Sequence, residues 1–195
     1  MERFASTACL LVGSLGLNLE GIMDCGLLLG ASALVAASPL VERQSFSTDP
    51  NAPCGVQSFG TGPPSGSDAS FEANPAYSAF AFAAPAPKGY KAAFRNQDGS
   101  TQQDGYMGYY LLQTYNTTAC GQYCDNANGC NAFNIYFERD PLLNPAPACP
   151  NPLPTTNIKC SLWGSPVSAA TATNEGQYRE QFHVVIAGSD GFNKQ

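Results

Sequence analysis

The sequence predicts an α+β fold in which one central helix packs against an antiparallel sheet of about five strands, stabilised by disulfides. Three observations indicate this. Residues 117–124 carry helix signals and two cysteines, and several other segments alternate apolar and polar residues with the period of a strand. The chain of 195 residues also contains 19 Gly and 15 Pro but only 12% charged residues, which is typical of a protein rich in loops and strands.

The predicted helix begins beside Thr117 or Thr118, either of which suits an N-cap, and it contains no Pro. Cys120 and Cys124 stand four positions apart, so both sulfurs lie on one face of the helix. The polar run 125–129 ends in Gly and ends the helix. The helix can therefore be joined covalently to whatever lies beneath it.

Strand signals begin at residue 89. Phe133, Ile135 and Phe137 alternate with other residues and predict a strand with one buried face. Six prolines between residues 139 and 154 exclude regular structure there, so we expect a loop pinned by Cys149. The predicted strands cover residues 90–95, 106–113, 131–138, 158–164 and 177–186.

The N-terminal residues 1–37 predict a signal peptide, with small side chains at Val35 and Ala37 before the cleavage position. Met23 is an alternative start that leaves a signal of more usual length. A membrane anchor is the competing interpretation, but neither apolar run reaches about 18 residues without a charge. We therefore expect the protein to be secreted.

Residues 38–88 are expected to form a short pro-segment, ending at Arg43, and then an arm rich in Pro, Gly and Ser. A short helix interrupted by Pro75 is expected between residues 67 and 84. Cys54 needs a partner, which predicts that the arm is tied to the domain. The domain itself is expected to span residues 89–190, followed by a C-terminal tail, 191–195.

Six of the eight cysteines lie outside the N-terminal apolar segment, an even number that suits a disulfide framework in a secreted protein. Six cysteines allow 15 pairings, and their spacing does not choose among them. The alternative is a zinc site built from four of them, Cys120, Cys124, Cys130 and Cys160. An oxidising compartment favours disulfides over zinc, so we expect no metal and no cofactor.

The cysteine-rich segment resembles the PAN/apple module in the form seen in small secreted fungal proteins. The resemblance covers residues 89–190 and implies a helix cradled by a curled sheet, in a domain that binds protein or carbohydrate. By this resemblance Cys120 pairs with Cys160 and Cys124 with Cys130, which leaves Cys54 for Cys149. The motifs that carry it are Cys-x3-Cys at 120–124, Gly-Cys at 129–130, Ala-Phe-Asn-Ile-Tyr-Phe at 132–137 and Lys-Cys-Ser-Leu-Trp at 159–163.

The net charge of −6 and the absence of a Lys/Arg cluster argue against nucleic acid and against anionic membrane surfaces as partners. No nucleophile, metalloprotease or phosphate-loop motif is present, so we do not expect an enzyme. His183 is interpreted as an ordinary strand residue. Glu138 and Asp140 flank Arg139 and are expected to form a local ion-pair turn.

We therefore expect a secreted, non-catalytic module that binds an extracellular glycan or protein. The alternatives are a disulfide-hardened structural or cell-wall-associated protein without a ligand and, last, a hydrolase that uses Glu138, Asp140 or His183. For each candidate binding residue, packing in the core is the competing role. Asn116, in Asn-Thr-Thr, is a candidate glycosylation site. The candidate ligand-binding residues are Tyr109, Tyr136, Arg139, Trp163, Tyr178 and His183.

Overall fold

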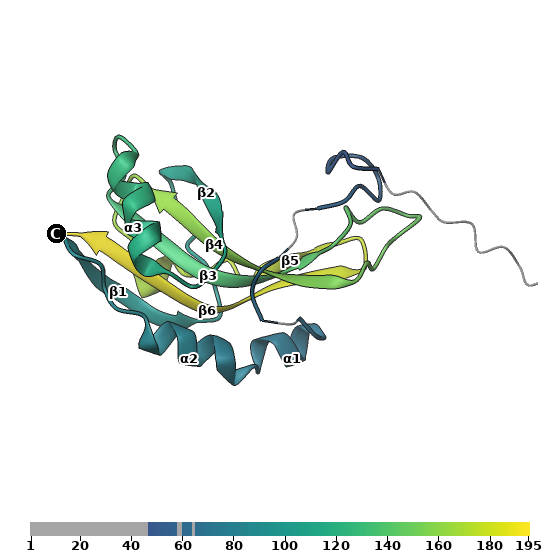
Figure 1. Cartoon of the computed structure of the whole chain (residues 1–195), viewed down its shortest axis with the longest axis horizontal. Coiled ribbons are helices and arrows are strands. Elements are labelled where there is room, and N and C mark those ends of the chain that lie inside the picture. The colour runs from purple at the N-terminus through teal and green to yellow at the C-terminus, as the bar shows by residue number, and fades with distance from the viewer. Residues whose placement is uncertain (1–46, 58–59, 64) are drawn as a thin grey trace, which may run out of the picture. The chain divides into compact units, whose positions relative to one another are not determined.

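The computed structural model describes residues 47–57, 60–63 and 65–195. The predicted signal peptide 1–37, the alternative start at Met23 and the pro-segment ending at Arg43 lie outside the described residues. The described part is α+β, as predicted (Figure 1). Its elements are α1 (Asp68–Glu72), α2 (Pro75–Ala83), β1 (Tyr90–Gln97), β2 (Tyr106–Leu112), α3 (Thr117–Asn126), β3 (Ala132–Pro141), β4 (Pro154–Trp163), the 3-10 helix η1 (Ala169–Thr171), β5 (Gly176–Arg179) and β6 (Phe182–Lys194).

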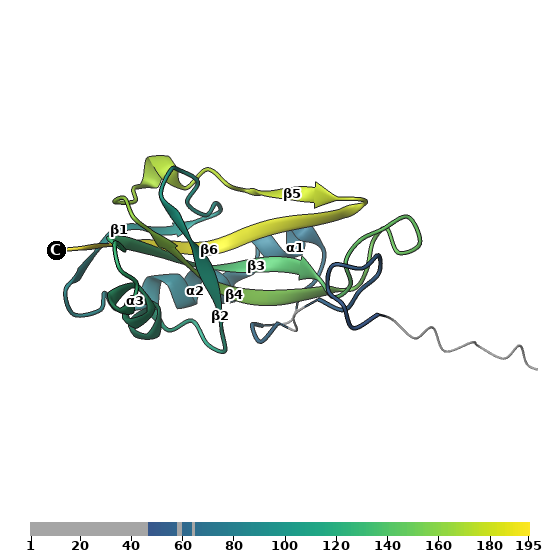
Figure 2. The same ribbon diagram turned by 90° about the horizontal axis from the view of Figure 1, so that it is seen from above.

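The six strands form one antiparallel sheet in the order β1-β6-β3-β4-β2, with β5 paired to the other end of β6. α1 and α2 pack on β6, and α3 packs on β3 and β4 (Figure 1). β2 forms an edge of the sheet beside β4 (Figure 2). No helix in the described ranges has both the length and the apolar character needed to cross a bilayer.

One face of the sheet, which we call the helical face, holds the main core. Phe133, Ile135 and Phe137 of β3 are fully buried there, as their alternation predicts. Phe71 of α1 and Tyr77 of α2 belong to the same core, with 4.5 Å between their ring centres. Each such side chain stabilises the fold by about 1.5–3 kcal/mol on burial. The opposite face of β3, which we call the loop face, is buried as well, beneath the loops 98–105 and 164–175 and neighbouring side chains, so the expectation of a single buried face is wrong.

The participation of α1 and α2 in this core corrects the expected boundary at residue 89. The helical segment does break at Pro75, but Pro75 starts α2 in its first turn, where a missing N–H costs nothing. Asn74 caps α2, and Ser67 caps α1. The segment expected to be part of an arm is therefore part of the domain.

Several strand boundaries differ from the prediction. β3 and β4 continue into the proline-rich segment, and Pro141 pairs with Pro154 where the two strands end. Prolines are tolerated there because a strand end leaves ladder positions without a required donor. The last predicted strand is a hairpin of β5 and β6, turned at Glu180 with φ +53°, so the sheet has six strands instead of about five. β6 runs to Lys194 and pairs with β1, so most of the expected tail 191–195 belongs to the sheet.

α3 begins one residue earlier than predicted. Its N-cap is Asn116, whose side chain accepts a hydrogen bond of 2.9 Å from the Ala119 N–H. Thr117, one of the two expected caps, instead donates its hydroxyl to the Pro85 carbonyl oxygen. This contact holds the start of α3 against the chain that follows α2.

Three disulfides join Cys54 to Cys149, Cys120 to Cys160 and Cys124 to Cys130. They are the three pairs named above. The second fixes α3 to β4, and the first fixes the segment 47–57 to the β3–β4 loop. All four cysteines of the zinc alternative are disulfide-bonded, so they do not supply thiolate ligands.

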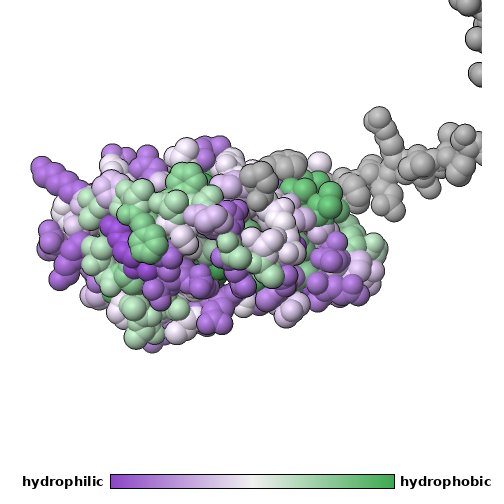
Figure 3. All heavy atoms as spheres, turned by 90° about the horizontal axis from the view of Figure 1, so that it is seen from below, coloured by the Kyte–Doolittle hydropathy of each residue, from purple (hydrophilic) through white to green (hydrophobic). Residues whose placement is uncertain are grey.

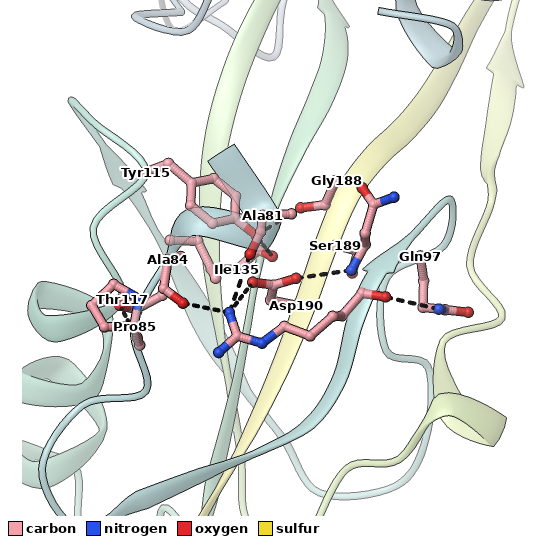
Figure 4. Close-up of polar contacts among 12 residues, drawn as sticks. Ala81, Ala84, Pro85, Gln97, Tyr115, Thr117, Ile135, Gly188, Ser189 and Asp190 are labelled. Atoms are coloured by element: carbon pink, nitrogen blue, oxygen red, sulfur yellow. Dashed lines mark hydrogen bonds and ion pairs between the residues drawn. The ribbon is translucent and has the colours of Figure 1, made fainter. Parts of the chain in front are cut away.

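A buried ion pair connects the end of α2 to the sheet (Figure 4). The Asp190 carboxylate of β6 is fully buried and lies 2.8 Å from Arg95 Nη1 of β1. The same nitrogen donates to the carbonyl oxygens of Ala81 and Ala84, which end α2. Nearby, the Tyr115 hydroxyl donates to the carbonyl oxygens of Ile135 and Gly188 (Figure 4).

Candidate functional site

The structure separates the six candidate ligand-binding residues into two groups. Tyr109, Tyr136 and Trp163 lie on the loop face of β2, β3 and β4. The other three lie around the β5–β6 hairpin and the start of α1: Arg139, Tyr178 and His183. Two members of the first group share a groove.

The groove lies on the loop face and has a volume of about 360 Å³. Its floor comes from β3 and β4, one side from β2, and the other side from the two loops. It contains three aromatic rings and six polar uncharged side chains, and no charged residue. The lining residues are Ser100, Thr101, Gln102, Gln103, Tyr106, Tyr136, Ser161, Trp163 and Asn174.

A bulge in β2 decides which aromatic rings face the groove. Tyr106 pairs with Trp163, and Tyr109 pairs with Ser161, so three steps on β2 match two on β4. Gly108 lies inside this irregularity with φ +104°, a conformation that glycine adopts without steric cost. In a regular strand, residues three apart point to opposite faces. The bulge therefore gives Tyr106 and Tyr109 the same face.

The floor of the groove is rigid. Trp163 is only 4% exposed and Tyr136 only 7%. The Trp163 indole N–H donates to the Ser161 hydroxyl, which in turn donates to the Asn134 carbonyl oxygen. Burial raises the pKa of Tyr136 well above its usual range, so its hydroxyl is neutral. Tyr106 is 55% exposed and lies with its ring centre 5.3 Å from that of Trp163, so an exposed ring lies beside a buried one.

Hydrogen bonds between distant segments position the walls. The backbones of Ser100 and Asn174 exchange two hydrogen bonds, at 2.9 and 3.0 Å. The Thr101 N–H donates to the side-chain oxygen of Asn134, which is fully buried in β3. Gln103 donates its amide to the carbonyl oxygens of Ser165 and Pro166. The two loops are therefore tied to each other and to the sheet floor.

A charged cluster continues the loop face next to the groove. Lys159 of β4 forms ion pairs with Glu138 and with Asp140, the latter at 3.1 Å. This corrects the expected local ion-pair turn, because residues 138–140 are extended in β3 and both carboxylates face Lys159 across the strands. Arg139 points to the helical face, where it donates to the carbonyl oxygens of Gly66 and His183.

Burial raises the pKa of Glu138 to about 8, and repulsion from Asp140 adds to the effect. Burial alone would lower the pKa of Lys159, but the two carboxylates raise it, so the ammonium keeps its proton. Asn157 donates a hydrogen bond of 2.6 Å to Asp140. Lys159 and Asp140 thus form the charged pair, with Glu138 as the group that most readily takes up a proton.

The second group of candidates holds the molecule together. The rings of Tyr178 and His183 stack at 4.2 Å, and His183 Nδ1 lies 3.0 Å from the Asp68 carboxylate of α1. The hydrogen bond from His183 lowers the pKa of Asp68. Arg139 lies over the Phe182 ring at 4.3 Å. Arg139 and His183 therefore connect β3, β6 and the start of α1, away from the groove.

Sequence reasoning missed Tyr106 and the loop residues that line the groove. The signal for Tyr106 was present, since it starts the aromatic segment 106–113. The bulge at Gly108 was not predicted from the sequence. In a regular strand Tyr106 and Tyr109 would point to opposite faces of the sheet. Gln103 and Asn174 are far apart in sequence, and only tertiary contacts bring them together.

Exposed apolar side chains gather on β2. Among the described residues, five of the ten large hydrophobic side chains that are exposed belong to this strand: Tyr106, Met107, Tyr109, Tyr110 and Leu111. On the side covered by α1 and α2, hydrophobic residues instead occur in small areas separated by hydrophilic ones (Figure 3). An exposed apolar concentration at a sheet edge is typical of a surface that contacts a ligand or partner. Comparisons of the chain with protein-family models, with curated proteins and with solved structures find no match.

Proposed function

We propose that the chain is a secreted, non-catalytic binding module of PAN/apple type whose loop-face groove recognises carbohydrate. The observation that carries this proposal is the lining of the groove, in which the rings of Tyr106, Tyr136 and Trp163 stand among amides and hydroxyls without a single charge. Sugars present apolar ring faces and many hydroxyls, so they match aromatic rings beside uncharged polar groups.

Four further features support the proposal. Thr101 lines the groove, and its hydroxyl is buried without a hydrogen-bond partner among the described residues; such a group gains from a polar ligand. The floor is fixed by the Trp163–Ser161–Asn134 hydrogen bonds, so little ordering entropy is lost on binding. Three disulfides support an oxidising, extracellular compartment. Asn116 and Thr118 are both exposed, which suits glycosylation.

The way the acidic residues are held supports a non-catalytic role. Glu138 and Asp140 are both held by Lys159, and Asp140 also accepts from Asn157. A hydrolase needs one carboxyl group free to donate a proton and another free to act on the opposite side of the bond. Here both are committed to the same ammonium.

Binding of a protein is the second candidate, and the apolar edge strand β2 favours it. An extended segment of a partner can add to an unpaired edge through backbone hydrogen bonds. This candidate uses Tyr110 and Leu111, which lie outside the groove lining.

The proposal is tested by screening the secreted chain on an array of neutral and acidic oligosaccharides, followed by titration calorimetry. Tyr106→Ala should weaken binding about five- to thirtyfold, since loss of one stacked ring costs on the order of 1–2 kcal/mol. Tyr178→Ala is the matched control, because Tyr178 is 68% exposed and lies outside the groove lining. Absence of saturable glycan binding, or equal loss in both variants, would rule out a carbohydrate groove. If the wild-type chain retains a secreted protein in a pull-down and the Leu111→Lys variant does not, binding of a protein partner at the edge strand β2 is favoured.

A further inference from the structure

The groove has a separate neighbour on the loop face. A second hollow of about 120 Å³ follows it on the loop face, lined by Tyr109, Asp140, Asn157, Lys159 and Arg179 and by parts of Gln57 and Leu111. Its lining residues pair directly with those of the groove across the strands. Tyr109 pairs with Ser161, and Lys159 pairs with Tyr136.

Strand β4 runs beneath both hollows. Trp163 and Ser161 belong to the groove, and Lys159 and Asn157 belong to the second hollow. These residues alternate along one strand, so they share the loop face. Six residues of strand separate Trp163 from Asn157, a length of about 20 Å, which is several times the width of one sugar ring.

Each hollow has its own exposed aromatic ring. Tyr106 stands at the groove, and Tyr109, 51% exposed, stands at the second hollow. The bulge at Gly108 is what sets both rings on the same face. Tyr109 is supported from below by the Lys159 ammonium, 5.1 Å from its ring centre. A single sugar would need only one of these platforms, whereas a chain of sugars meets both.

The lysine charge in the second hollow is compensated. Lys159 forms the charged pair with Asp140, with Glu138 as a second partner, and Arg179, which has no ion-pair partner among the described residues, donates a hydrogen bond of 2.7 Å to the Asn144 side chain. The chain as a whole carries −6 charges, which repels a polyanion. The groove itself holds no charged residue. The chemistry of the whole track suits an uncharged ligand with many hydroxyls.

We propose that the second hollow is a further subsite, and that the ligand is a linear, uncharged oligosaccharide of several units lying along β4 over Tyr106 and Tyr109. This inference rests on the proposed carbohydrate-binding function. It adds the length and the charge of the ligand, and it gives Tyr109 a role separate from that of Tyr106.

The test is calorimetry with two uncharged series, β-1,4-linked glucose and β-1,4-linked N-acetylglucosamine, each from one to six units. For the series that binds, affinity should rise at least about tenfold from two units to six, as the second platform is engaged. Tyr109→Ala should remove most of this gain and reduce the affinity for two units much less. Tyr106→Ala should weaken every length. Tyr178→Ala serves as the control, and thermal melting of each variant checks that it folds.

The outcomes separate the two proposals. If neither series binds wild type at any length and the oligosaccharide array shows no saturable binding either, the carbohydrate function and the subsite are both wrong. If a series binds but affinity is independent of length and Tyr109→Ala changes nothing, the groove stands and the second subsite is wrong. Binding of a uronic-acid series in preference to both neutral ones would overturn the assignment of an uncharged ligand.

Discussion

Tyr106 and Tyr109 stand three positions apart on β2 but face the same side of the sheet, because the strand bulges at Gly108 between them. One glycine with φ +104° thus converts an edge strand into a row of two exposed rings beside Trp163. β-Bulges are common at sheet edges and next to functional sites, where they redirect side chains. Gly108 is therefore the first residue to test by substitution.

Gly108→Ala should reduce ligand binding more than its effect on stability explains. A Cβ at Gly108 meets no atom within 4 Å, so the cost is backbone strain, about 1–2 kcal/mol at a positive φ. Relief of that strain rotates Tyr106 away from Trp163. Gly89→Ala is the matched control, since φ is +82° there and the space around its Cβ is also open. Thermal melts should show similar losses for both variants, and titration should show weakened binding for Gly108→Ala only. Equal binding by the two variants would show that the bulge does not contribute to the binding site.

The two disulfides of α3 should differ in their contribution to stability. Cys120–Cys160 spans 40 positions and Cys124–Cys130 spans 6. Loop-closure entropy then predicts losses of about 4 and about 2 kcal/mol when each pair is replaced by Ala. Denaturant unfolding of the two double variants measures the difference. A larger loss for Cys124–Cys130 would show that loop entropy does not govern these bonds.

Arg95→Met should destabilise the domain by about 3–5 kcal/mol, because it leaves the buried Asp190 carboxylate unpaired. It also removes the donor to the last carbonyl oxygens of α2. Adding Asp190→Asn should recover part of the loss, since the unpaired charge is then absent. Arg179→Met, which removes a bond to Asn144 only, should cost less than about 1 kcal/mol. Urea unfolding of wild type, of the single variants Arg95→Met, Asp190→Asn and Arg179→Met, and of the double variant checks this, and additive losses in the double variant would contradict the ion-pair account.

Stability should decrease as the pH rises from about 5 to 8. Burial raises the pKa of Asp190 to about 6 and that of Glu138 to about 8. The folded state therefore takes up protons more readily than the unfolded chain, so the contribution of each group is complete at low pH. It is lost as the pH rises through the folded-state pKa. Calorimetric melting at steps of pH should show a decline on the order of 1–3 kcal/mol.

Glu138→Gln should flatten the part of this decline between pH 6 and 8, because the glutamine amide does not titrate. Asp190→Asn should instead flatten the part between pH 4 and 6. An unchanged profile in Glu138→Gln would show that another group controls stability in that range.

Local sequence patterns determined most of the secondary structure. The apolar alternation of Phe133, Ile135 and Phe137 identified the central strand, and the Cys-x3-Cys segment identified α3. Boundaries were less certain where prolines or a tight turn lay near a strand end, as at Pro141 and Glu180. At these positions the local preference of a residue competes with pairing to a strand that is distant in sequence. The pairing determines where the strand ends.

The candidate site was predicted in part. Aromatic content indicated Tyr109, Tyr136 and Trp163, and these do lie on one face of the sheet. Arg139 and His183 could not be separated from them by sequence, because their role depends on contacts with Gly66 and Asp68, in a segment that was expected to belong to the arm.

The sequence by itself determined the fold class, the central helix, the strand that it covers and the even set of cysteines, because these follow from periodicity and composition within short windows. The tertiary structure alone decided the position of α1 and α2 in the core, the partners of Lys159 and the common face of Tyr106 and Tyr109. These three features depend on which strands become neighbours and on where a single glycine shifts the strand register. Neither can be determined from a short window of the sequence.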